Sequence, residues 1–236
     1  MKNIAIIGAT GAIGTALIER LLFCGEDNNL YLYTRTPVLW QHQRIQSYSL
    51  DICDERSIEQ ASAQLNENRL DLIIIATGVL HDAVTKPEKS YIELEKGNLE
   101  KLFLVNTIGP ALLLKFFLPL MKKNVPVCCA LLSAKVGSIG DNYLGGWYSY
   151  RMSKAALNML IKTASIEFKR KNPQGTIIGL HPGTVTSPLS QPYLDKINHT
   201  IFSPSEAAEL MLKVITSVQP EDSGYTLSYD GKRLPF

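Results

Sequence analysis

The amino-acid sequence predicts a doubly wound α/β domain, in which helices cover both faces of a parallel sheet. Short runs of β-branched and other apolar residues alternate along the chain with longer segments of helical period. Several of the short runs are apolar at successive positions, which is typical of strands buried on both faces. The length of 236 residues and the hydrophobic content of 45% fit a single large domain over the whole chain, residues 1–236.

Each predicted element follows from its local pattern. Apolar runs predict strands at Ile4–Ile7, Leu30–Tyr33, Ile45–Ser49, Leu72–Ile75, Val127–Leu132, Ile177–Leu180 and, at one edge, Tyr225–Tyr229. Helical periodicity predicts helices at Ala12–Phe23, Ser57–Leu65, Leu99–Lys122 and Tyr150–Lys171, and a last helix that Pro204 opens behind a Ser203 cap. Residues 79–96 and 184–202 are too long for simple connections. Because ligands bind beside long loops at the carboxyl ends of such strands, we expect both to border the substrate site.

The charge balance excludes two classes of partner. Lysine and arginine total 24 against 22 acidic residues, which gives a formal charge of +2, and no basic run stands out. We therefore expect neither a nucleic-acid surface nor an anionic-membrane surface. The four cysteines lack metal-ligand spacing, so we expect reduced thiols, no metal and a reducing compartment. They are Cys24, Cys53, Cys128 and Cys129.

Two apolar stretches raise the question of a membrane. The N-terminal run is too short for a signal peptide, and glycines stand where a cleavage region would lie. The stretch Leu102–Met121 is interrupted by Asn106, Pro110, Lys115 and Pro119. A buried core helix fits this stretch better than a membrane span. We therefore expect a soluble, cytoplasmic protein.

A glycine-rich turn, GATGAIG, lies between the first predicted strand and the first predicted helix. Glycines allow a tight turn and let a pyrophosphate approach the backbone, and the helix N-terminus offers unpaired N–H groups. A plain glycine-rich turn is the alternative, but the strand–turn–helix context favours a dinucleotide-binding loop. The expected cofactor contacts in this turn are Gly8, Thr10, Gly11, Ala12, Ile13 and Gly14.

The end of the second predicted strand indicates which dinucleotide is bound. Folds that prefer NAD usually carry an acid there, whereas this chain has Thr34 and then Arg35. A guanidinium can pair in bidentate geometry with the 2′-phosphate of NADP, which an acid would repel. The sequence therefore favours NADP(H), with NAD as the second choice and an ordinary surface arginine as the alternative. After the third strand, Asp51 is placed to accept from the adenine amino group, and Ile52 is expected beside it.

A tyrosine and a lysine one helical turn apart are candidates for proton transfer. Tyr150 and Lys154 form Y-x-x-x-K at the start of a predicted helix, so both side chains lie on one face. A free phenol has a pKa of about 10 and is a poor acid–base catalyst at neutral pH. A neighbouring cation and an oxidised nicotinamide favour the phenolate and move that pKa toward the working range. The lysine can also donate to the nicotinamide ribose. A surface Tyr–Lys pair is the alternative.

Together these motifs resemble the short-chain dehydrogenase/reductase superfamily over essentially the whole chain. Within it, SAKVGSIGDN, GGWYSYRMSKAALN, LHPGTV and YDGKRLPF resemble the C-factor and Sniffer branch. The resemblance implies a doubly wound Rossmann domain with strand order 3-2-1-4-5-6-7, NAD(P) binding, and carbonyl reduction with Tyr150 as proton donor. It places Lys154 at the ribose. It also implies a homodimer or homotetramer, paired through the helices that begin near Leu99 and Tyr150.

The resemblance adds further site residues and three departures. Asn106, in VNTIGPALL, matches the asparagine that holds a helix kink and a water linked to the lysine. Residues expected to line the nicotinamide are Pro182, Gly183, Val185 and Ser187. Ala12 stands where a glycine is usual. The family's Asn-Asn-Ala-Gly after the fourth strand is Ile75, Ala76, Thr77 and Gly78 here, of which the last three are expected cofactor contacts. The departure from Asn-Asn-Ala-Gly weakens the support that this segment is expected to give the backbone, but it does not affect the expected chemistry.

The third departure concerns the serine that polarises the substrate carbonyl. In the family it usually stands three residues before the glycine that is Gly137 here, and that position holds Ala134. Ser133 lies one residue earlier at the strand end, and Ser138 lies just beyond the glycine. An ordinary strand would point Ser133 to the face opposite position 134. We expect Ser133 to supply the hydroxyl, with Ser138 as the alternative.

Three functional classes suit this fold. The leading hypothesis is an NADPH-dependent oxidoreductase, of the carbonyl reductase or alcohol dehydrogenase type, acting on a small molecule. The rival is a dinucleotide-binding signalling or sensor protein with little turnover; Tyr150 argues against it, since a pure binder has no need of that residue. A dimerisation scaffold leaves the glycine loop unexplained. An apolar, partly aromatic pocket mouth is expected from Leu80, Tyr143, Leu144, Trp147 and the segment Pro188–Phe202.

Overall fold

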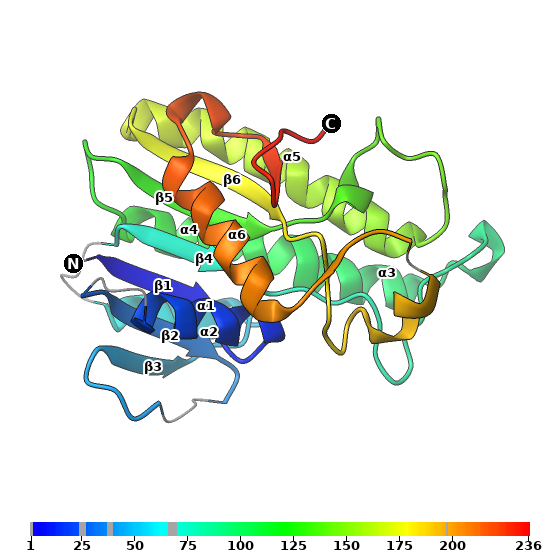
Figure 1. Cartoon of the computed structure of the whole chain (residues 1–236), viewed down its shortest axis with the longest axis horizontal. Helices are drawn as coiled ribbons and strands as arrows, with labels where there is room; N and C mark the ends of the chain where they lie inside the picture. The colour runs from blue at the N-terminus through cyan, green and yellow to red at the C-terminus, as the bar shows by residue number, and fades with distance from the viewer. Residues whose placement is uncertain (1, 24–26, 37–39, 66–69, 197) are drawn as a thin grey trace.

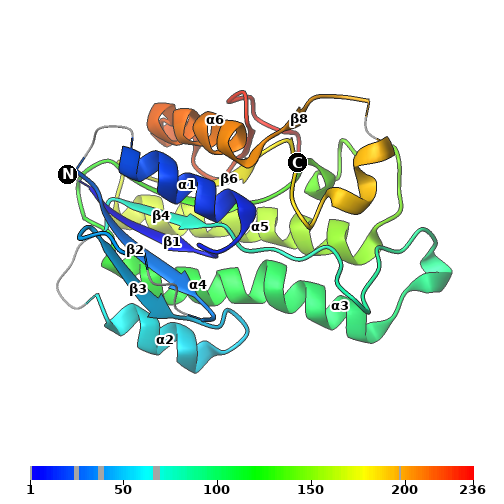
Figure 2. The same ribbon diagram turned by 60° about the horizontal axis from the view of Figure 1, so that its bottom comes forward.

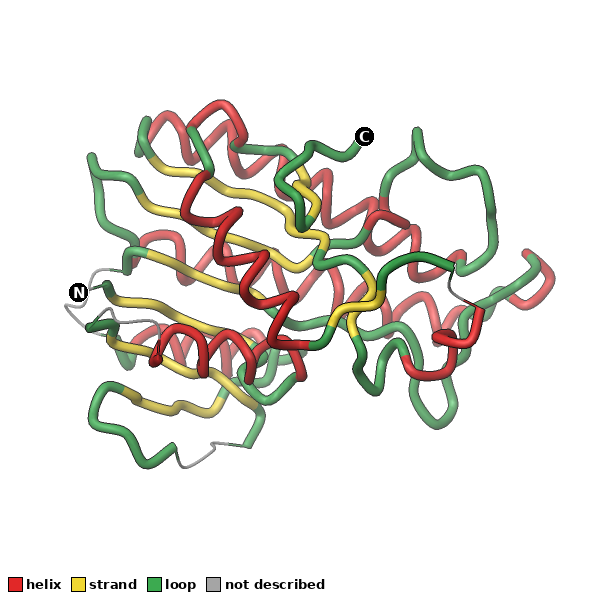
Figure 3. Tube along the Cα trace, in the orientation of Figure 1, coloured by secondary structure: helices red, strands yellow, loops and turns green. Residues whose placement is uncertain are grey.

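A seven-stranded parallel sheet organises the computed structural model, which describes residues 2–23, 27–36, 40–65, 70–196 and 198–236. The strand order is β3-β2-β1-β4-β5-β6-β9, which confirms the expected 3-2-1-4-5-6-7 (Figures 1 and 3). The strands are β1 (Asn3–Ile7), β2 (Asn29–Thr34), β3 (Ile45–Ser49), β4 (Leu72–Ile75), β5 (Val127–Leu132), β6 (Gly175–His181) and β9 (Thr226–Ser228). Because neighbouring strands are parallel throughout, their carboxyl ends share one edge of the sheet.

Helices cover both faces of the sheet (Figure 2). The helices α1 (Ala12–Phe23) and α6 (Pro204–Ser217) bury their apolar sides on one face, where Leu17 and Met211 join the core. The opposite face is covered by α2 (Glu55–Ala63), α4 (Gly109–Phe117) and α5 (Tyr148–Lys171). Each face of the sheet therefore has its own hydrophobic core, as expected for strands that are apolar on both faces.

Capping side chains determine where two helices begin. The Asp54 side chain accepts from the backbone N–H of Arg56 at 3.0 Å, so α2 begins at Glu55, ahead of the expected Ser57. At α6 the expected cap is present, with Pro204 in the first turn and a reciprocal capping box between Ser203 and Glu206. The sequence pattern placed these starts to within two residues.

The longest predicted helix is divided into segments. It runs from α3 (Lys96–Phe103) through a π-helical turn (η2, Leu104–Ile108) into α4 and ends in the 3₁₀ turn η3 (Leu118–Leu120). The stretch Lys96–Leu120 is long and apolar enough to cross a membrane by composition alone. Leu113, Leu114 and Phe117 nevertheless pack in the core beneath the sheet, so it is a partly buried core helix, as expected.

Both expected substrate loops contain short ordered elements. The first holds η1 (Tyr91–Glu93). In the second, β7 (Thr184–Val185) pairs with β8 (Ile201–Phe202), and η5 (Gln191–Lys196) lies between them; residue 197 is outside the described residues. Further 3₁₀ turns are η4 (Lys135–Gly137) and η6 (Pro220–Asp222). Two-residue strands carry too little periodicity to be predicted from sequence.

Candidate active site

A cavity of about 480 Å³ opens at the carboxyl edge of the sheet, where β1, β4, β5 and β6 end. Most of the residues expected to bind cofactor or act in catalysis line this cavity. They are Thr10, Gly11, Ala12, Ile13, Ala76, Thr77, Gly78, Ser133, Tyr150, Lys154, Pro182, Gly183, Val185 and Ser187. The fold thus brings together segments that are up to 177 residues apart, from 10 to 187.

The glycine turn before α1 has the tight geometry that its sequence predicts. Gly8 adopts φ +85°, and the N–H of Gly11 donates to the Gly8 carbonyl at 3.1 Å. A Cβ at Gly14 would lie 2.3 Å from the same carbonyl oxygen. Neither Gly8 nor Gly14 lines the cavity, so both act by shaping the turn that Gly11 and Ala12 present to it.

Two buried polar atoms on cavity-lining residues lack partners among the described residues. They are the Thr77 hydroxyl, after β4, and Nδ1 of His181, at the end of β6, and both residues line the cavity. Buried polar groups are normally hydrogen-bonded, so these atoms suit a polar ligand. Together with the glycine turn and the N-terminus of α1, they fit a nicotinamide dinucleotide.

Three other expected cofactor contacts lie outside the cavity. Arg35 is exposed after β2, and no carboxylate in the described part of the chain forms an ion pair with it. Asp51 uses Oδ1 to accept from the Cys53 N–H at 2.9 Å. Ile52 is buried and packs so closely on α4 that a Cβ at Gly109 would lie 2.3 Å from its Cγ1. The structure places these residues along the ends of β2 and β3, where a second half of a dinucleotide would extend.

Tyr150 and Lys154 lie together in the cavity wall at the start of α5. Their exposures are 8% and 3%, and the lysine Nζ is 5.9 Å from the centre of the tyrosine ring. Burial raises the pKa of Tyr150 to about 12 and lowers the pKa of Lys154 to about 8. In the protein alone, burial therefore opposes the expected stabilisation of the phenolate by the lysine. The phenol keeps its proton at neutral pH.

Lys154 is held by the backbone rather than by a carboxylate. Its Nζ donates to the Leu132 carbonyl at the end of β5, at 2.8 Å. A Cβ at Gly78 would lie 3.5 Å from this Nζ and 3.6 Å from Oδ1 of Asn106. The ends of β4 and β5 therefore position the ammonium group toward the cavity.

Asn106 is fully buried in the π-helical turn, where the resemblance predicted a kink. Its side chain bonds both backbone groups of Val79, accepting from N–H and donating to C=O at 2.9 Å each. Its Nδ2 also donates to the Ser153 hydroxyl at 3.0 Å, and that hydroxyl donates to the Tyr150 carbonyl. Asn106 does not line the cavity; it ties the segment after β4 to the helix that carries Tyr150.

A buried glutamate, which sequence reasoning missed, fixes the start of α5. Glu88 is 3% exposed, and its carboxylate accepts from the backbone N–H of Ser149 at 3.1 Å and from the Ser149 hydroxyl. Its carbonyl accepts from the Trp147 N–H at 2.5 Å. Trp147 itself has φ +51°. An anion at a helix N-terminus satisfies unpaired N–H groups, so Glu88 positions the turn that carries Tyr150.

The two candidate serines have different surroundings. Ser133 lines the cavity, and its hydroxyl donates to Oδ1 of Asn158 at 2.6 Å. Ser138 lies outside the lining, and its hydroxyl donates to the Phe236 carbonyl at 3.4 Å and accepts from the Asp141 N–H at 3.1 Å. Of the two serines, Ser133 is the one in the cavity wall, and its hydroxyl is already bonded to Asn158.

Asn158 is a second residue that sequence reasoning missed. Besides Ser133, its Oδ1 accepts from the Thr226 hydroxyl on β9 at 2.9 Å. Its Nδ2 donates to the Gly137 carbonyl at 3.2 Å. One amide thus joins the end of β5, the following turn and the edge strand to α5. The quoted motif contained this asparagine, but only the fold shows what it connects.

Aromatic side chains form one side of the cavity mouth. Trp147 and Tyr193 have ring centres 5.0 Å apart, and His81 packs on Tyr193 at 5.7 Å. Nε2 of His81 is 2.9 Å from the Leu189 carbonyl, which ties the first substrate loop to the second. Lining residues in the mouth include Leu80, Trp147, Pro188, Leu189 and Tyr193, as expected.

Two residues expected at the mouth are elsewhere. Tyr143 and Leu144 are 87% and 93% exposed, and neither lines the cavity. The turn around Gly145 and Gly146, both with positive φ, carries them out into solvent. Their apolar character alone therefore gave a wrong placement.

The described cysteines are free. Cys128 and Cys129 are buried in β5, Cys53 is exposed, and Cys24 is outside the described residues. Within the described ranges, no group of three His, Cys, Asp or Glu side chains could hold a metal ion.

Comparison with known proteins agrees with this geometry. A family model described as "short chain dehydrogenase" matches residues 2–198. The chain is 28% identical over 237 residues to the 1-hydroxy-2-glutathionyl-2-methyl-3-butene dehydrogenase of a Rhodococcus species, covering 99% of both chains. It is 31% identical over 145 residues to the C-signal protein of Myxococcus xanthus, covering 61% of this chain and 82% of that one.

Solved structures show the same fold. The carbonyl reductase Sniffer of D. melanogaster aligns over 100% of both chains with a TM-score of 0.85 and 22% identity. An NADPH-bound carbonyl reductase from chicken fatty liver aligns over 100% of this chain and 94% of its own, with a TM-score of 0.86 and 25% identity.

Proposed function

Because the chain belongs to the short-chain dehydrogenase/reductase family of oxidoreductases, we propose that it is an NADPH-dependent reductase of carbonyl compounds. The observation that carries the proposal is the juxtaposition of Tyr150 and Lys154 in one cavity with the glycine turn. Relatives that are named carbonyl reductases or dehydrogenases support the same reaction class. The sheet takes strands from Asn3 to Ser228, which supports one dinucleotide-binding domain over residues 1–236.

The proposed cofactor site follows the glycine turn. Residues 10–13 would contact the pyrophosphate, with Gly8 and Gly14 shaping the turn, and residues 76–78 and the segment around Pro182, Gly183, Val185 and Ser187 would border the nicotinamide half. Arg35 would pair with the 2′-phosphate of NADP, which suits an exposed guanidinium that has no carboxylate partner among the described residues. Asp51 and Ile52 would lie beside the adenine, and NAD is the second choice.

The bound nicotinamide would supply or accept the hydride at the substrate carbon. The protein's own part is the proton. In reduction, Tyr150 would transfer its hydroxyl proton to the carbonyl oxygen and become a phenolate. The Lys154 ammonium would stabilise that phenolate and bind the ribose. Because burial raises the pKa of Tyr150 to about 12, the tyrosine holds its proton at neutral pH, which is the protonation state that the proposed reduction needs.

Two further residues complete the proposed catalytic set. Ser133 would donate to the substrate carbonyl, supported by its place in the cavity wall where Ala134 offers only a methyl group. Asn106 would hold the helix turn and a water linked to Lys154, supported by its bonds to Val79 and Ser153.

The cavity mouth suits a medium-sized apolar carbonyl compound or its alcohol, since leucine and aromatic side chains form it. We also propose a homodimer or homotetramer in the cytoplasm. On α5, Met152, Met159 and Ile166 recur at helical spacing and are 47%, 66% and 51% exposed, which supports pairing through that helix. The free cysteines of the described residues suit a reducing compartment. Sedimentation velocity tests the assembly.

The second candidate is a dinucleotide-binding signalling protein with little turnover. Similarity to the C-signal protein favours it. Turnover separates the two candidates, because a sensor needs neither the Tyr150 proton nor an aromatic substrate mouth.

The experiment that tests the proposal is a screen of NADPH oxidation against ketones, aldehydes and quinones. We expect saturable, enzyme-dependent oxidation with at least one class. Tight NADPH binding without turnover on any carbonyl would favour the signalling candidate instead.

A further inference from the structure

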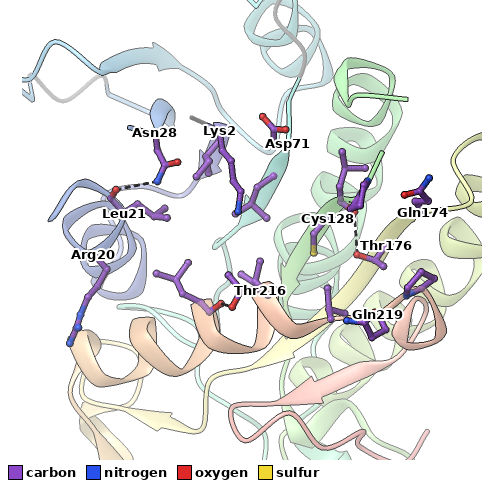
Figure 4. Close-up of a pocket in the computed structure, with 18 residues that line it drawn as sticks. Lys2, Arg20, Leu21, Asn28, Asp71, Cys128, Gln174, Thr176, Thr216 and Gln219 are labelled. Carbon is purple, nitrogen blue, oxygen red and sulfur yellow. Dashed lines mark hydrogen bonds between the residues drawn. The ribbon is translucent and has the colours of Figure 1, made fainter. Parts of the chain in front are cut away.

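A second cavity lies at the edge of the sheet opposite the candidate active site (Figure 4). It is bordered by the amino ends of β1, β4, β5 and β6 and by the last turns of α1 and α6, two helices that diverge there (Figure 1). Its volume is about 660 Å³, within the range of small-molecule sites. In the described part of the chain, the two cavities have no lining residue in common.

The inner wall of this cavity is apolar. Ile4, Leu72 and Ile215 are buried there, and Leu21 and Leu212 are half-buried on the two helices that flank it. An apolar ligand that covers this wall removes apolar surface from water, which is favourable by roughly 25 cal/mol per Å². The wall does not suit a strongly hydrated ion.

Within the described ranges, one buried polar atom in the wall lacks a hydrogen-bond partner. Asn28 is 2% exposed, and its Nδ2 donates to the Leu21 carbonyl at 3.3 Å, which fixes the orientation of the amide. Figure 4 shows the amide oxygen turned away from Leu21. That Oδ1 is buried and accepts no hydrogen bond from any residue that the structure describes. An acceptor left unsatisfied in this way costs about 1–3 kcal/mol, so the position favours a donor from outside the chain.

The charged groups around the cavity are either in ion pairs or exposed to solvent. Asp71 is paired with Lys122 at 2.7 Å, and Arg20 with Glu209 at 2.9 Å. Lys2 is exposed at the rim of the cavity. Among the described residues, the wall therefore provides an acceptor but no unpaired buried charge, which suits an uncharged ligand.

From this geometry we propose that the cavity is a second ligand site, for an uncharged and largely apolar small molecule that directs one O–H or N–H donor at Oδ1 of Asn28. A bicyclic aromatic alcohol has a suitable size and chemistry. The site is independent of the proposed reduction, because it lies at the other edge of the sheet.

The test measures binding of 2-naphthol and of its methyl ether, 2-methoxynaphthalene, to the NADPH-loaded protein by calorimetry. The ether has the same apolar body without the donor. We expect 2-naphthol to bind about tenfold more tightly, the effect of about one hydrogen bond. Asn28→Leu removes that advantage and leaves the affinity for the ether unchanged.

Steric variants locate the binding. Thr216→Trp fills the second cavity and abolishes binding of both probes, whereas Ser217→Trp, the matched control on the exposed side of α6, preserves it. Leu189→Trp, which narrows the candidate active site, leaves the affinities unchanged. Equal affinity for the two probes, binding that survives Thr216→Trp, or no saturable binding because only water fills the cavity would each overturn the proposal.

Discussion

Burial shifts the pKa values of Tyr150 and Lys154 in opposite directions. The sequence spacing places both side chains on one face of a helix, but it does not show how deeply they lie. Once buried, Tyr150 holds its proton at neutral pH, and Lys154, with a pKa of about 8, titrates close to the working range. In the proposed reduction, Tyr150 would donate this proton, and the bound substrate and nicotinamide would have to stabilise the phenolate that remains.

Cofactor preference is tested at Arg35. We expect Arg35→Ala to weaken NADPH binding by about 1.5–3 kcal/mol, roughly tenfold or more, because one charged hydrogen-bond donor to the 2′-phosphate is lost. Affinity for NADH, which lacks that phosphate, stays unchanged. Fluorescence titration of both cofactors measures the difference. Equal affinities for NADPH and NADH in the unmutated protein would rule out this role.

The two serines are tested by comparison. Ser133→Ala is expected to lower the rate on an accepted carbonyl compound by on the order of 10²–10³, the usual effect of losing one preorganised donor. Ser138→Ala, whose hydroxyl bonds Phe236 away from the cavity, is expected to leave the rate near normal. A large loss for Ser138→Ala alone would reverse the assignment, and near-normal rates for both would leave the carbonyl to Tyr150.

At the scale of elements, the start of α5 is fixed by a distant loop. Glu88 and Ser149 are 61 residues apart, and no local cap motif precedes the helix. Sequence reasoning therefore placed the helix but missed its anchor. The π-helical turn at Asn106 depends in the same way on the backbone of Val79. Local patterns predicted the strands and helices well because apolar periodicity is local, whereas these braces form only when the chain folds.

We expect Glu88→Ala to lower the free energy of unfolding by about 1–3 kcal/mol, because it leaves the buried N–H and hydroxyl of Ser149 without their acceptor. Turnover should fall as well, since Tyr150 lies one residue further along. Glu93→Ala, in the same loop but exposed, is the matched control. Urea unfolding of both variants provides the comparison. Equal stabilities would mean that Glu88 does not anchor the helix.

At the scale of the whole molecule, the parallel sheet has a cavity at each of its two edges. The carboxyl edge gathers the glycine turn, the Tyr–Lys pair and the substrate loops, and the amino edge holds the second cavity. The strand order was implied by the family resemblance, and the clustering could be predicted because parallel strands bring their carboxyl ends to one edge. The amino-edge cavity could not, since it depends on how α1 and α6 diverge. Tyr143 and Leu144 were misplaced because the apolar character of a residue does not show whether its side chain points into the cavity or into solvent.

The stability of the whole fold should depend on His181 in acid. Burial, with smaller effects of Lys135 and His199, lowers the pKa of His181 from 6.5 to about 4. Between pH 6.5 and 4, His181 is therefore protonated in the unfolded chain but neutral in the folded chain. Stability is complete above about pH 6.5 and falls by up to about 3 kcal/mol as the pH drops through 4.

Replacing the titrating group checks this. His181→Gln should flatten the fall in unfolding free energy between pH 6.5 and 4, whereas the exposed His199→Gln should keep most of it. Urea unfolding across this range measures the slopes. An unchanged slope in His181→Gln would assign the acid sensitivity to other groups.

The most direct test of the account is the rate of NADPH oxidation by Tyr150→Phe on an accepted carbonyl compound, measured beside its NADPH dissociation constant. The ring still packs at the start of α5, but no hydroxyl remains to protonate the developing alkoxide. We predict a rate loss on the order of 10²–10⁴ with NADPH affinity within about twofold of the unmutated protein. A variant that keeps most of its rate would contradict the assignment of Tyr150 as the proton donor.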